Sequence, residues 1–345
     1  MRIQIVSGHG EVSGGEQMLL RIATASAELG HRVVVVGPRW GELREACAEH
    51  NLRYHGLPGA SRRSYAGYLV RHLLVRRDAL VWANGAMPAL AATLTPDPLV
   101  VHLHQDLSTA QAAATALVRA RARALVVPSH NMQQRIPGSV ALSNWTRRLA
   151  VRAPVPRGDT LTIGFVGRLS LDKGVDLLAV ALDEVATALP KHRIRLLIAG
   201  DDRFVPQESA SQVAFALGAA KAEIVRLGWV DPAEVYRQAH VCVVPSRWAE
   251  PFGLVAAEAM AVGCPLVVSD AGALPEVTGA DYPFVFRAGD AGQLSETVAS
   301  VLTQDCSEQT SALRVRWESE YSPDAGRRRL GELLAWIAAS ASGVL

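Results

Sequence analysis

Residues 163–174 read IGFVGRLSLDKG, and this stretch decides how the second half of the 345-residue chain folds. An apolar run ends in Gly167, a short loop follows, and Gly174 opens an apolar stretch, Val175–Ala188, with helical character. Strand, glycine-containing loop and helix in this order are typical of a βαβ unit in a parallel sheet.

Two cations, Arg168 and Lys173, follow the end of this strand. Glycines beside them allow the backbone to approach a ligand closely, and the two positive charges suit a diphosphate. The alternative is a pair of cations on an exposed surface.

The same alternation of short β-rich runs and helical stretches extends over the chain. Expected strands are Ile3–Ser7, Arg32–Val36, Ala79–Trp82, Leu99–Leu103 and Ala124–Val127, then Thr162–Val166, Arg195–Ala199, Glu223–Leu227, Val241–Val244 and Pro265–Val268. We therefore predict an α/β fold of two Rossmann-like domains that face a central cleft, where ligands bind at the carboxyl ends of the strands.

The turn-rich segment Asn144–Asp159 marks the expected domain boundary. The first domain then comprises residues 1–155 and the second residues 156–323. The remaining stretch, residues 324–345, contains an amphipathic helix that we expect to pack back on the first domain.

The composition is that of a soluble globular protein, with no apolar run of the roughly 18–20 residues that span a bilayer. No secretory signal is apparent, and the four cysteines include no CxxC pair, so we expect a reducing cytoplasm and no structural zinc site. Residues 1–155 hold 18 Arg and 9 Asp+Glu, whereas the rest of the chain is acidic. A basic first domain suits an anionic acceptor, a phosphorylated lipid or peripheral contact with an acidic membrane, and compositional drift is the alternative.

Residues 250–258 read EPFGLVAAE and carry the strongest local signal. They follow the expected strand Val241–Val244 and enter a helix near Phe252, whose first N–H groups are donors at the positive end of a dipole. Glu250 can accept hydrogen bonds from sugar hydroxyls. Glu258 lies roughly 10–12 Å further along the helix, about the distance from a hexose to the ribose of its nucleotide. The alternative is two solvated helix carboxylates.

These two blocks resemble the retaining glycosyltransferases of family 4, which have the GT-B fold. The resemblance extends to residues 257–265 (AEAMAVGCP) and 271–277 (AGALPEV), and to the strands at residues 197–201 and 225–230. It is close over residues 162–277 and looser elsewhere. It implies a nucleotide-sugar-binding second domain and an acceptor-binding first domain.

The resemblance also implies roles for individual residues. Arg168 and Lys173 would stabilise the departing diphosphate, Glu258 would hold the ribose, and Glu250 would contact the donor sugar. The backbone of Phe252, Gly253 and Leu254 would line the sugar and phosphate site, with Val230 bordering the base.

The first domain carries a glycine-rich turn in residues 13–16 (SGGE), where the family places Gly14 and Gly15 near the phosphates or the acceptor. Its spacing is not that of a nicotinamide-binding loop. Gln17 replaces a basic residue often found in the family, and 345 residues is short for it, so we expect trimmed acceptor loops.

Two histidines end the strand at Leu99–Leu103. His104 resembles the family's cleft histidine near the reacting sugar, and His102, two residues earlier on the same face, is the competing candidate. Asn84, Ser129 and Asn131 end other strands, and none of them is singled out.

No Asp-x-Asp element is present, so we expect metal-independent transfer without a cofactor other than the nucleotide sugar, UDP- or GDP-linked. The resemblance implies retention of the anomeric configuration. The sequence leaves two classes of acceptor open: a secondary metabolite, such as an antibiotic intermediate, and a cell-envelope glycolipid or polysaccharide. A nucleotide-sugar epimerase or hydrolase and a non-catalytic nucleotide-sugar-binding protein are the rivals, and no nucleic-acid-binding motif accompanies the basic half.

Overall fold

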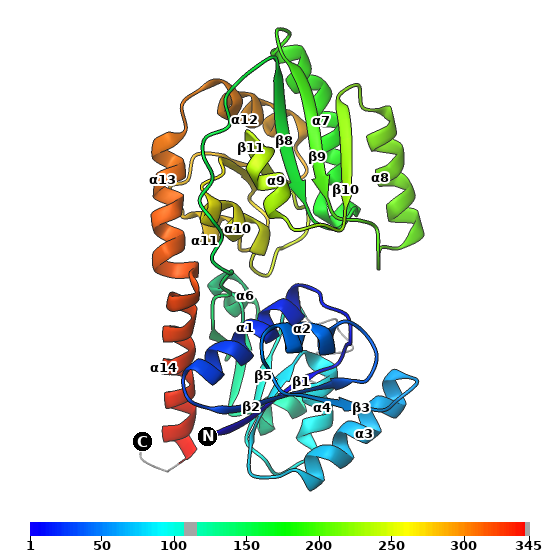
Figure 1. The fold of residues 1–345 in the computed structure, drawn as a ribbon, viewed down its shortest axis with the longest axis vertical. Helices are drawn as coiled ribbons and strands as arrows, with labels where there is room; N and C mark the ends of the chain where they lie inside the picture. The colour runs from blue at the N-terminus through cyan, green and yellow to red at the C-terminus, as the bar shows by residue number, and fades with distance from the viewer. Residues whose placement is uncertain (107–115, 342–345) are drawn as a thin grey trace. The chain divides into compact units, whose positions relative to one another are not determined.

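The computed structural model describes residues 1–106 and 116–341, which form two units, each a parallel sheet between layers of helices (Figure 1). Unit 1 comprises the described residues of Met1–Trp145 and Pro323–Leu345, and unit 2 comprises Thr146–Ser322. The central strands of both sheets are runs of Val, Ile and Leu that are buried on both faces, as parallel sheets require.

Unit 1 contains a seven-stranded sheet of order β3-β2-β1-β4-β5-β6-β7. Its strands are β1 (Arg2–Ser7), β2 (Arg32–Pro38), β3 (Tyr54–Leu57), β4 (Leu80–Asn84), β5 (Leu99–His102), β6 (Ala124–Val127) and β7 (Val140–Ala141). Helices α1 (Gly14–Glu28), α2 (Leu43–Glu49) and α14 (Pro323–Ala341) cover one face, and α3 (Arg62–Val75), α4 (Ala86–Thr93) and α6 (His130–Arg135) cover the other.

Unit 2 contains a six-stranded sheet of order β10-β9-β8-β11-β12-β13. Its strands are β8 (Thr160–Val166), β9 (Arg193–Ala199), β10 (Glu223–Gly228), β11 (Val241–Val244), β12 (Leu266–Ser269) and β13 (Val285–Phe286). Helices α7 (Val175–Ala188), α8 (Gln207–Ala219) and α12 (Ala291–Thr303) pack on one face, and α9 (Ala233–Gln238), α10 (Leu254–Val262), α11 (Leu274–Thr278) and α13 (Ser307–Arg316) on the other.

Both sheets confirm the predicted Rossmann-like architecture. In each unit the first strand lies between the second and the fourth. Successive strands are therefore added first on one side of β1 or β8 and then on its other side. All ten expected strands are present with small shifts of their ends. The strands that the sequence did not reveal are β3, β7 and β13. Two of them are two-residue edge strands, and β3 is an edge strand with polar residues, because an edge strand buries less of its surface.

The chain passes from unit 1 to unit 2 at Trp145–Thr146, earlier than the expected boundary after residue 155. Residues 142–158 form neither strand nor helix, but those after Trp145 bond to unit 2. The N–H of Thr146 donates to the carbonyl of Tyr321 at 3.0 Å, and that of Arg152 to the carbonyl of Val262 at 3.0 Å. Backbone pairing, which composition does not reveal, thus assigns this segment to unit 2.

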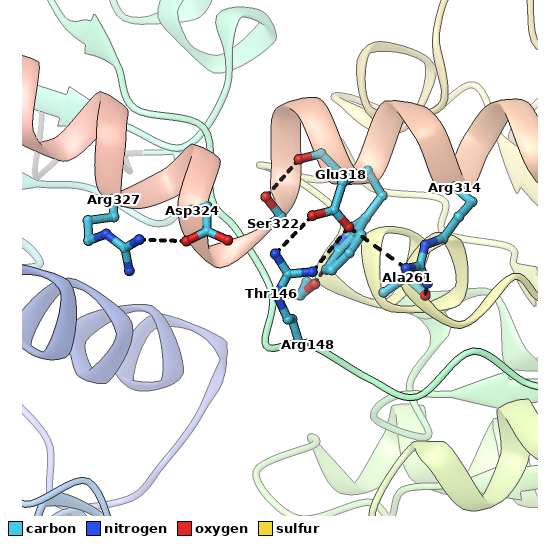
Figure 2. Close-up of polar contacts among 9 residues, drawn as sticks. Thr146, Arg148, Ala261, Arg314, Glu318, Ser322, Asp324 and Arg327 are labelled. Carbon is cyan, nitrogen blue, oxygen red and sulfur yellow. Dashed lines mark hydrogen bonds and ion pairs between the residues drawn. The ribbon is translucent and has the colours of Figure 1, made fainter.

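The chain leaves unit 2 through α13 and a π-helical turn, Trp317–Tyr321, that leads into α14. Figure 2 shows Arg148 donating two hydrogen bonds to the Glu318 carboxylate, at 2.9 and 3.2 Å, so the entering and leaving segments of unit 2 are tied together. The Trp317 indole N–H also donates to the Thr146 hydroxyl at 2.7 Å. Helix α14 then belongs to unit 1, where Leu330, Leu334 and Ile337 join the core.

Among residues 1–106 and 116–341, no helix combines the length and apolar character that crossing a bilayer requires.

Two glycines of α14 lead to opposite expectations. A Cβ at Gly326 would lie 2.1 Å from ring atom Cδ2 of the buried Trp145, whereas a Cβ at Gly331 would make ordinary 3.6 Å contacts with Leu29. Because the ring or the helix must move, we expect Gly326→Ala to lower the free energy of unfolding by about 1–3 kcal/mol. Gly331→Ala should raise it by about 0.5–1 kcal/mol, because alanine favours the helix. Urea denaturation measures both, and equal effects would contradict the packing of α14 on Trp145.

Candidate functional site

The candidate site of unit 2 lies at the carboxyl ends of β8 and β11, the neighbouring strands at which the chain reverses its direction of progress. Such a switch point is where doubly wound sheets bind ligands. Arg168 follows β8, and Lys173 ends a short 3-10 turn, Leu171–Lys173, in front of α7. Gly174 has φ of +70°, and a Cβ there would lie 1.9 Å from the carbonyl oxygen of Pro245, so only glycine allows the loops after β8 and β11 to approach this closely.

The structure brings Lys173 and Glu250 together as a largely buried ion pair. Nζ of Lys173 lies 2.5 Å from Oε1 of Glu250, with 21% and 8% of the two side chains exposed. The Ser246 hydroxyl donates to the same oxygen at 2.5 Å. Nζ also lies 5.1 Å from the centre of the Trp248 ring, a cation–π distance. The carboxylate is therefore compensated by a cation and a hydroxyl, which offsets the cost of its burial.

The backbone of Glu250 is held as firmly as its side chain. Its carbonyl accepts a hydrogen bond from the N–H of Ala273 at 2.9 Å. Gly272 has φ of +63°, and a Cβ there would lie 2.3 Å from the Glu250 nitrogen. With Oε1 occupied, Oε2 is the oxygen of Glu250 for which no described residue supplies a hydrogen bond. The carboxylate is thus fixed in place and can still accept a hydrogen bond from a ligand.

Arg168 is more exposed than Lys173 and pairs with Asp172 at 3.1 Å, with 42% and 34% of the two side chains exposed. An ion pair at this exposure is weak, about 0–1 kcal/mol, because water screens both charges. The guanidinium can therefore exchange its carboxylate partner for an anionic ligand at little cost.

Helix α10 begins at Leu254, two residues later than the sequence suggested. Gly253 precedes it with φ of +102°, and a Cβ there would lie 2.6 Å from Cδ2 of Leu274. Phe252 is buried and packs edge-on against Tyr321, with ring centres 5.3 Å apart. The helix start is thus anchored by an aromatic pair and a glycine that the packing requires.

Glu258 lies on the buried side of α10, which rules out a fully solvated carboxylate. The hydroxyl of Tyr236, on α9, donates to its Oε2 at 3.2 Å. Burial and the neighbouring Glu258 carboxylate together raise the pKa of Tyr236 well above its ordinary value, so this hydroxyl stays protonated as a donor.

The end of β10 exposes Val230 and its neighbour Trp229. The Arg203 guanidinium lies over the Trp229 ring at 4.5 Å and is held by Asp201 at 2.7 Å. The loops after β9 and β10 therefore present a stacked cation and indole at the same edge of the sheet.

In unit 1, the glycine-rich turn and His104 lie side by side. A Cβ at Gly15 would lie 3.2 Å from Cδ2 of His104, so the missing side chain makes room for the ring. Gly14 begins α1, and the Ser13 hydroxyl donates to the buried Glu16 carboxylate at 2.5 Å. His104 Nε2 lies 2.6 Å from Oδ1 of Asn84, and burial lowers the pKa of His104 to about 4. His104 is thus neutral at physiological pH.

His102 is fully buried, and neither ring nitrogen has a hydrogen-bond partner among the described residues. Its ring lies 4.1 Å from that of His104 and edge-on to Trp82, with centres 5.8 Å apart. Burial, and to a lesser extent His104, keeps the pKa of His102 well below its ordinary value. Of the two competing histidines, His104 is partly exposed and His102 is not.

Four residues that contact the candidate site residues were not selected from the sequence: Asn84, Tyr236, Ser246 and Trp248. Asn84 and Ser246 follow or end strands at the carboxyl edge, a position that the sequence does show, but many strands end in polar residues. Tyr236 and Trp248 carry no signal in the sequence, because their contacts with Glu258 and Lys173 join segments that are distant in the sequence.

Among residues 1–106 and 116–341, no group of three or more His, Cys, Asp or Glu side chains could hold a metal ion.

Two protein-family models match the chain in sequence. Glycosyltransferase Family 4 matches residues 12–163, and Glycosyl transferases group 1 matches residues 160–304. An uncharacterised glycosyltransferase of Methanocaldococcus jannaschii is 36% identical over 138 residues, which are 39% of this chain and 34% of that protein. A D-inositol 3-phosphate glycosyltransferase of Corynebacterium jeikeium is 31% identical over 209 residues, 58% of this chain and 47% of that protein. The match thus spans about a third to a half of the length of these relatives.

Solved structures match over nearly the whole chain. The Anabaena protein HepE in complex with UDP and glucose has a TM-score of 0.82 at 20% identity, covering 97% of this chain and 99% of that one. Sucrose-phosphate synthase of Thermosynechococcus elongatus has a TM-score of 0.78 at 19% identity, covering 98% and 99%. At such identities the likeness establishes the fold, and it confirms the two Rossmann-like domains of the GT-B fold.

The burial of His102 predicts an acid-sensitive contribution to stability. Below the ordinary pKa of 6.5, the unfolded chain binds a proton at His102 that the folded chain excludes, so the free energy of unfolding falls as the pH drops. We expect His102→Phe to flatten this fall by up to about 1.4 kcal/mol per pH unit below about pH 6.5. Chemical denaturation between pH 7 and 4.5 measures the slope, with His9→Asn, at an exposed histidine, as the control. An unchanged slope in His102→Phe would show that His102 takes up a proton in the folded chain.

Proposed function

We propose that this chain, which belongs to the family 4 glycosyltransferases, transfers a sugar from a nucleoside-diphosphate donor to a hydroxyl of an acceptor. The observation that carries the proposal is the Lys173–Glu250 ion pair beside Arg168, at the carboxyl ends of β8 and β11. It combines cations for a diphosphate with a fixed carboxylate for hydroxyls in one place.

The two cations have complementary roles in the proposal. Lys173 has three N–H donors, of which Glu250 takes one, so it can bind a phosphate oxygen without leaving the pair. Arg168 exchanges Asp172 for the diphosphate. Negative charge accumulates on the departing diphosphate as its bond to the sugar breaks, and two preorganised cations stabilise that charge most where it develops.

The remaining site residues bind the rest of the donor. Glu250 accepts hydrogen bonds from sugar hydroxyls through Oε2, and Glu258, with its Tyr236 partner, accepts from the ribose. The backbone of Phe252, Gly253 and Leu254 at the start of α10 lines the sugar and phosphates. Val230 borders the base.

In unit 1 we assign Gly14 and Gly15 to the phosphates or acceptor and His104 to the reacting sugar. The support is the close packing of Gly15 on His104. A neutral imidazole suits hydrogen bonding to a hydroxyl better than it suits a charge on the sugar.

Retention of the anomeric configuration and transfer without a metal belong to the same proposal. Family membership supports retention. Two cations within one loop, and a sequence without an Asp-x-Asp element, support diphosphate stabilisation by side chains.

For the donor we propose a UDP- or GDP-linked sugar, and for the acceptor a small molecule with a hydroxyl group and negative charge. HepE, which shares the fold, is described with UDP-glucose, and relatives are named for D-inositol 3-phosphate, an anionic polyol. In the sequence, residues 1–145 and 323–345, the range of unit 1, hold 18 Arg against 11 Asp+Glu, which favours an anionic partner. A secondary metabolite, such as an antibiotic intermediate, is one such acceptor, and a cell-envelope glycolipid reached by peripheral membrane contact is the alternative.

Nucleotide binding tests the donor site directly. We expect one of UDP, GDP, ADP and dTDP to raise the Tm of the purified protein, equally with and without Mg²⁺, because the diphosphate meets Arg168 and Lys173. Glu258→Ala should abolish the shift, while Glu223→Ala, at the opposite edge of the sheet, should keep it. A folded protein that none of the four stabilises would refute the donor site, and binding without turnover would favour the non-catalytic alternative.

Measurements of turnover test whether Arg168 and Lys173 stabilise the departing diphosphate. With the sugar donor of the nucleotide that binds, Arg168→Ala and Lys173→Ala should each lower the release of nucleoside diphosphate by about 100-fold or more, because a charge-stabilising group is lost. Lys191→Ala, at the amino edge of the same sheet, should leave the rate unchanged, as should a chelator. Near-normal rates in both variants would refute the diphosphate role, and a rate lost to chelator and restored by Mg²⁺ or Mn²⁺ would refute metal independence.

A further inference from the structure

A short chain of hydrogen bonds in unit 1 runs from the start of α1 through Asn84 to His104. Asn84 ends β4 and lies beside His102 of the neighbouring strand β5, so it stands next to the loop that carries His104. Its Nδ2 lies 3.3 Å from the carbonyl oxygen of Gly15, and its Oδ1 lies 2.6 Å from Nε2 of His104.

The carbonyl of Gly15 determines which way the Asn84 amide points. A carbonyl oxygen only accepts hydrogen bonds, so the amide must turn its NH₂ group toward Gly15 and its oxygen toward His104. The amide oxygen in turn only accepts, so His104 must carry its proton on Nε2. The backbone carbonyl of Gly15 therefore selects the tautomer of His104 through two successive hydrogen bonds.

Among residues 1–106 and 116–341, the other contacts of the His104 ring are with Gly15 and His102. The Cγ–Cδ2 edge faces Gly15, at 3.2 and 3.4 Å from the position of a Cβ there, and the ring of His102 lies 4.1 Å away. Nothing in residues 1–106 or 116–341 hydrogen-bonds to Nδ1. In the Nε2–H tautomer, this nitrogen carries a lone pair and can only accept.

We propose that Asn84 is a positioning residue that holds His104 in its Nε2–H tautomer, so that Nδ1 accepts a hydrogen bond from a hydroxyl of the sugar substrate. The assignment rests on the proposed function, in which His104 meets the reacting sugar. It explains why the strand-end asparagine is buried: its amide bridges two elements, and either a leucine or a reversed amide would break the bridge. The ligand group that meets Nδ1 of His104 must then be a hydrogen-bond donor and not an anion.

The tautomer can be read without any ligand. In the full chain with ¹⁵N-labelled histidine, two-dimensional NMR distinguishes a protonated from an unprotonated ring nitrogen, and His104→Gln identifies the signal among the ten histidines. We expect wild-type His104 to carry its proton on Nε2 between pH 6 and 8. A proton on Nδ1, or equal populations of both tautomers, would overturn the proposal.

Two variants of Asn84 separate positioning from packing. Asn84→Leu removes both hydrogen bonds and should release the tautomer, whereas Asn84→Asp keeps an acceptor for Nε2–H and should retain it. Asn131→Leu, at a polar residue that bonds to Arg135, is the matched control and should leave the His104 signal unchanged. If Asn84→Leu does not fold, the wild-type and Asn84→Asp spectra decide the question. An unchanged tautomer in folded Asn84→Leu would overturn the positioning role.

Kinetics with UDP-glucose as the probe then test the hydroxyl contact. One neutral hydrogen bond corresponds to a loss of about 3- to 10-fold in kcat in Asn84→Leu, with a smaller change in KM. In Asn84→Asp the new carboxylate raises the pKa of His104, and a protonated imidazole cannot accept at Nδ1. Its kcat should therefore fall with decreasing pH at a higher pH than in the wild type. A released tautomer with unchanged kcat would overturn the hydroxyl contact, whereas a wild type that does not cleave UDP-glucose would refute that donor and leave the NMR result standing.

Discussion

The ion pair between Lys173 and Glu250 is the interaction on which the unit 2 site depends. It ties the loop after β8 to the loop after β11, and it places a cation beside a carboxylate that is only 6% exposed. Removing the cation would leave Glu250 with a single hydroxyl partner, a change that typically costs about 3–5 kcal/mol in a buried pair. Gly174 permits this approach, because a Cβ there would collide with the carbonyl of Pro245 in the loop after β11. Gly272, which follows β12, likewise allows close approach to the backbone of Glu250.

A parallel sheet explains why such a pair can form between residues 77 positions apart in the sequence. All strands run in one direction, so every loop that follows a strand emerges at the same edge. The order β9-β8-β11 places the loops after β8 and β11 next to each other, with helices leaving toward opposite faces. The candidate site residues therefore come from βα loops that are adjacent in the sheet although they are not consecutive in the chain.

The two units use different electrostatics at their equivalent edges. Unit 2 collects charges: Arg168, Lys173, Glu250 and Glu258. The edge of unit 1 at β4 and β5 holds neutral groups, since burial keeps both His102 and His104 uncharged and Asn84 joins His104 to α1 through hydrogen bonds. Charges suit a diphosphate, and oriented neutral donors and acceptors suit hydroxyl groups.

The sequence by itself determined the repeated βα pattern, because buried parallel strands must be apolar runs and the turns between them need glycine or polar residues. It also singled out Arg168, Lys173 and Glu250 as candidate site residues, since each stands near a strand end or a helix start, and Glu258 on the helix that follows Glu250. Tertiary structure alone decided which of these residues touch. The pairing of Lys173 with Glu250, the Tyr236 donor to Glu258 and the Asn84 bridge to His104 each join separate segments, and they depend on strand order and helix packing, which local periodicity does not encode. Tertiary structure also decided the boundary between the units. Residues 146–155 have no regular structure, and they are assigned to unit 2 only by the backbone groups with which they pair.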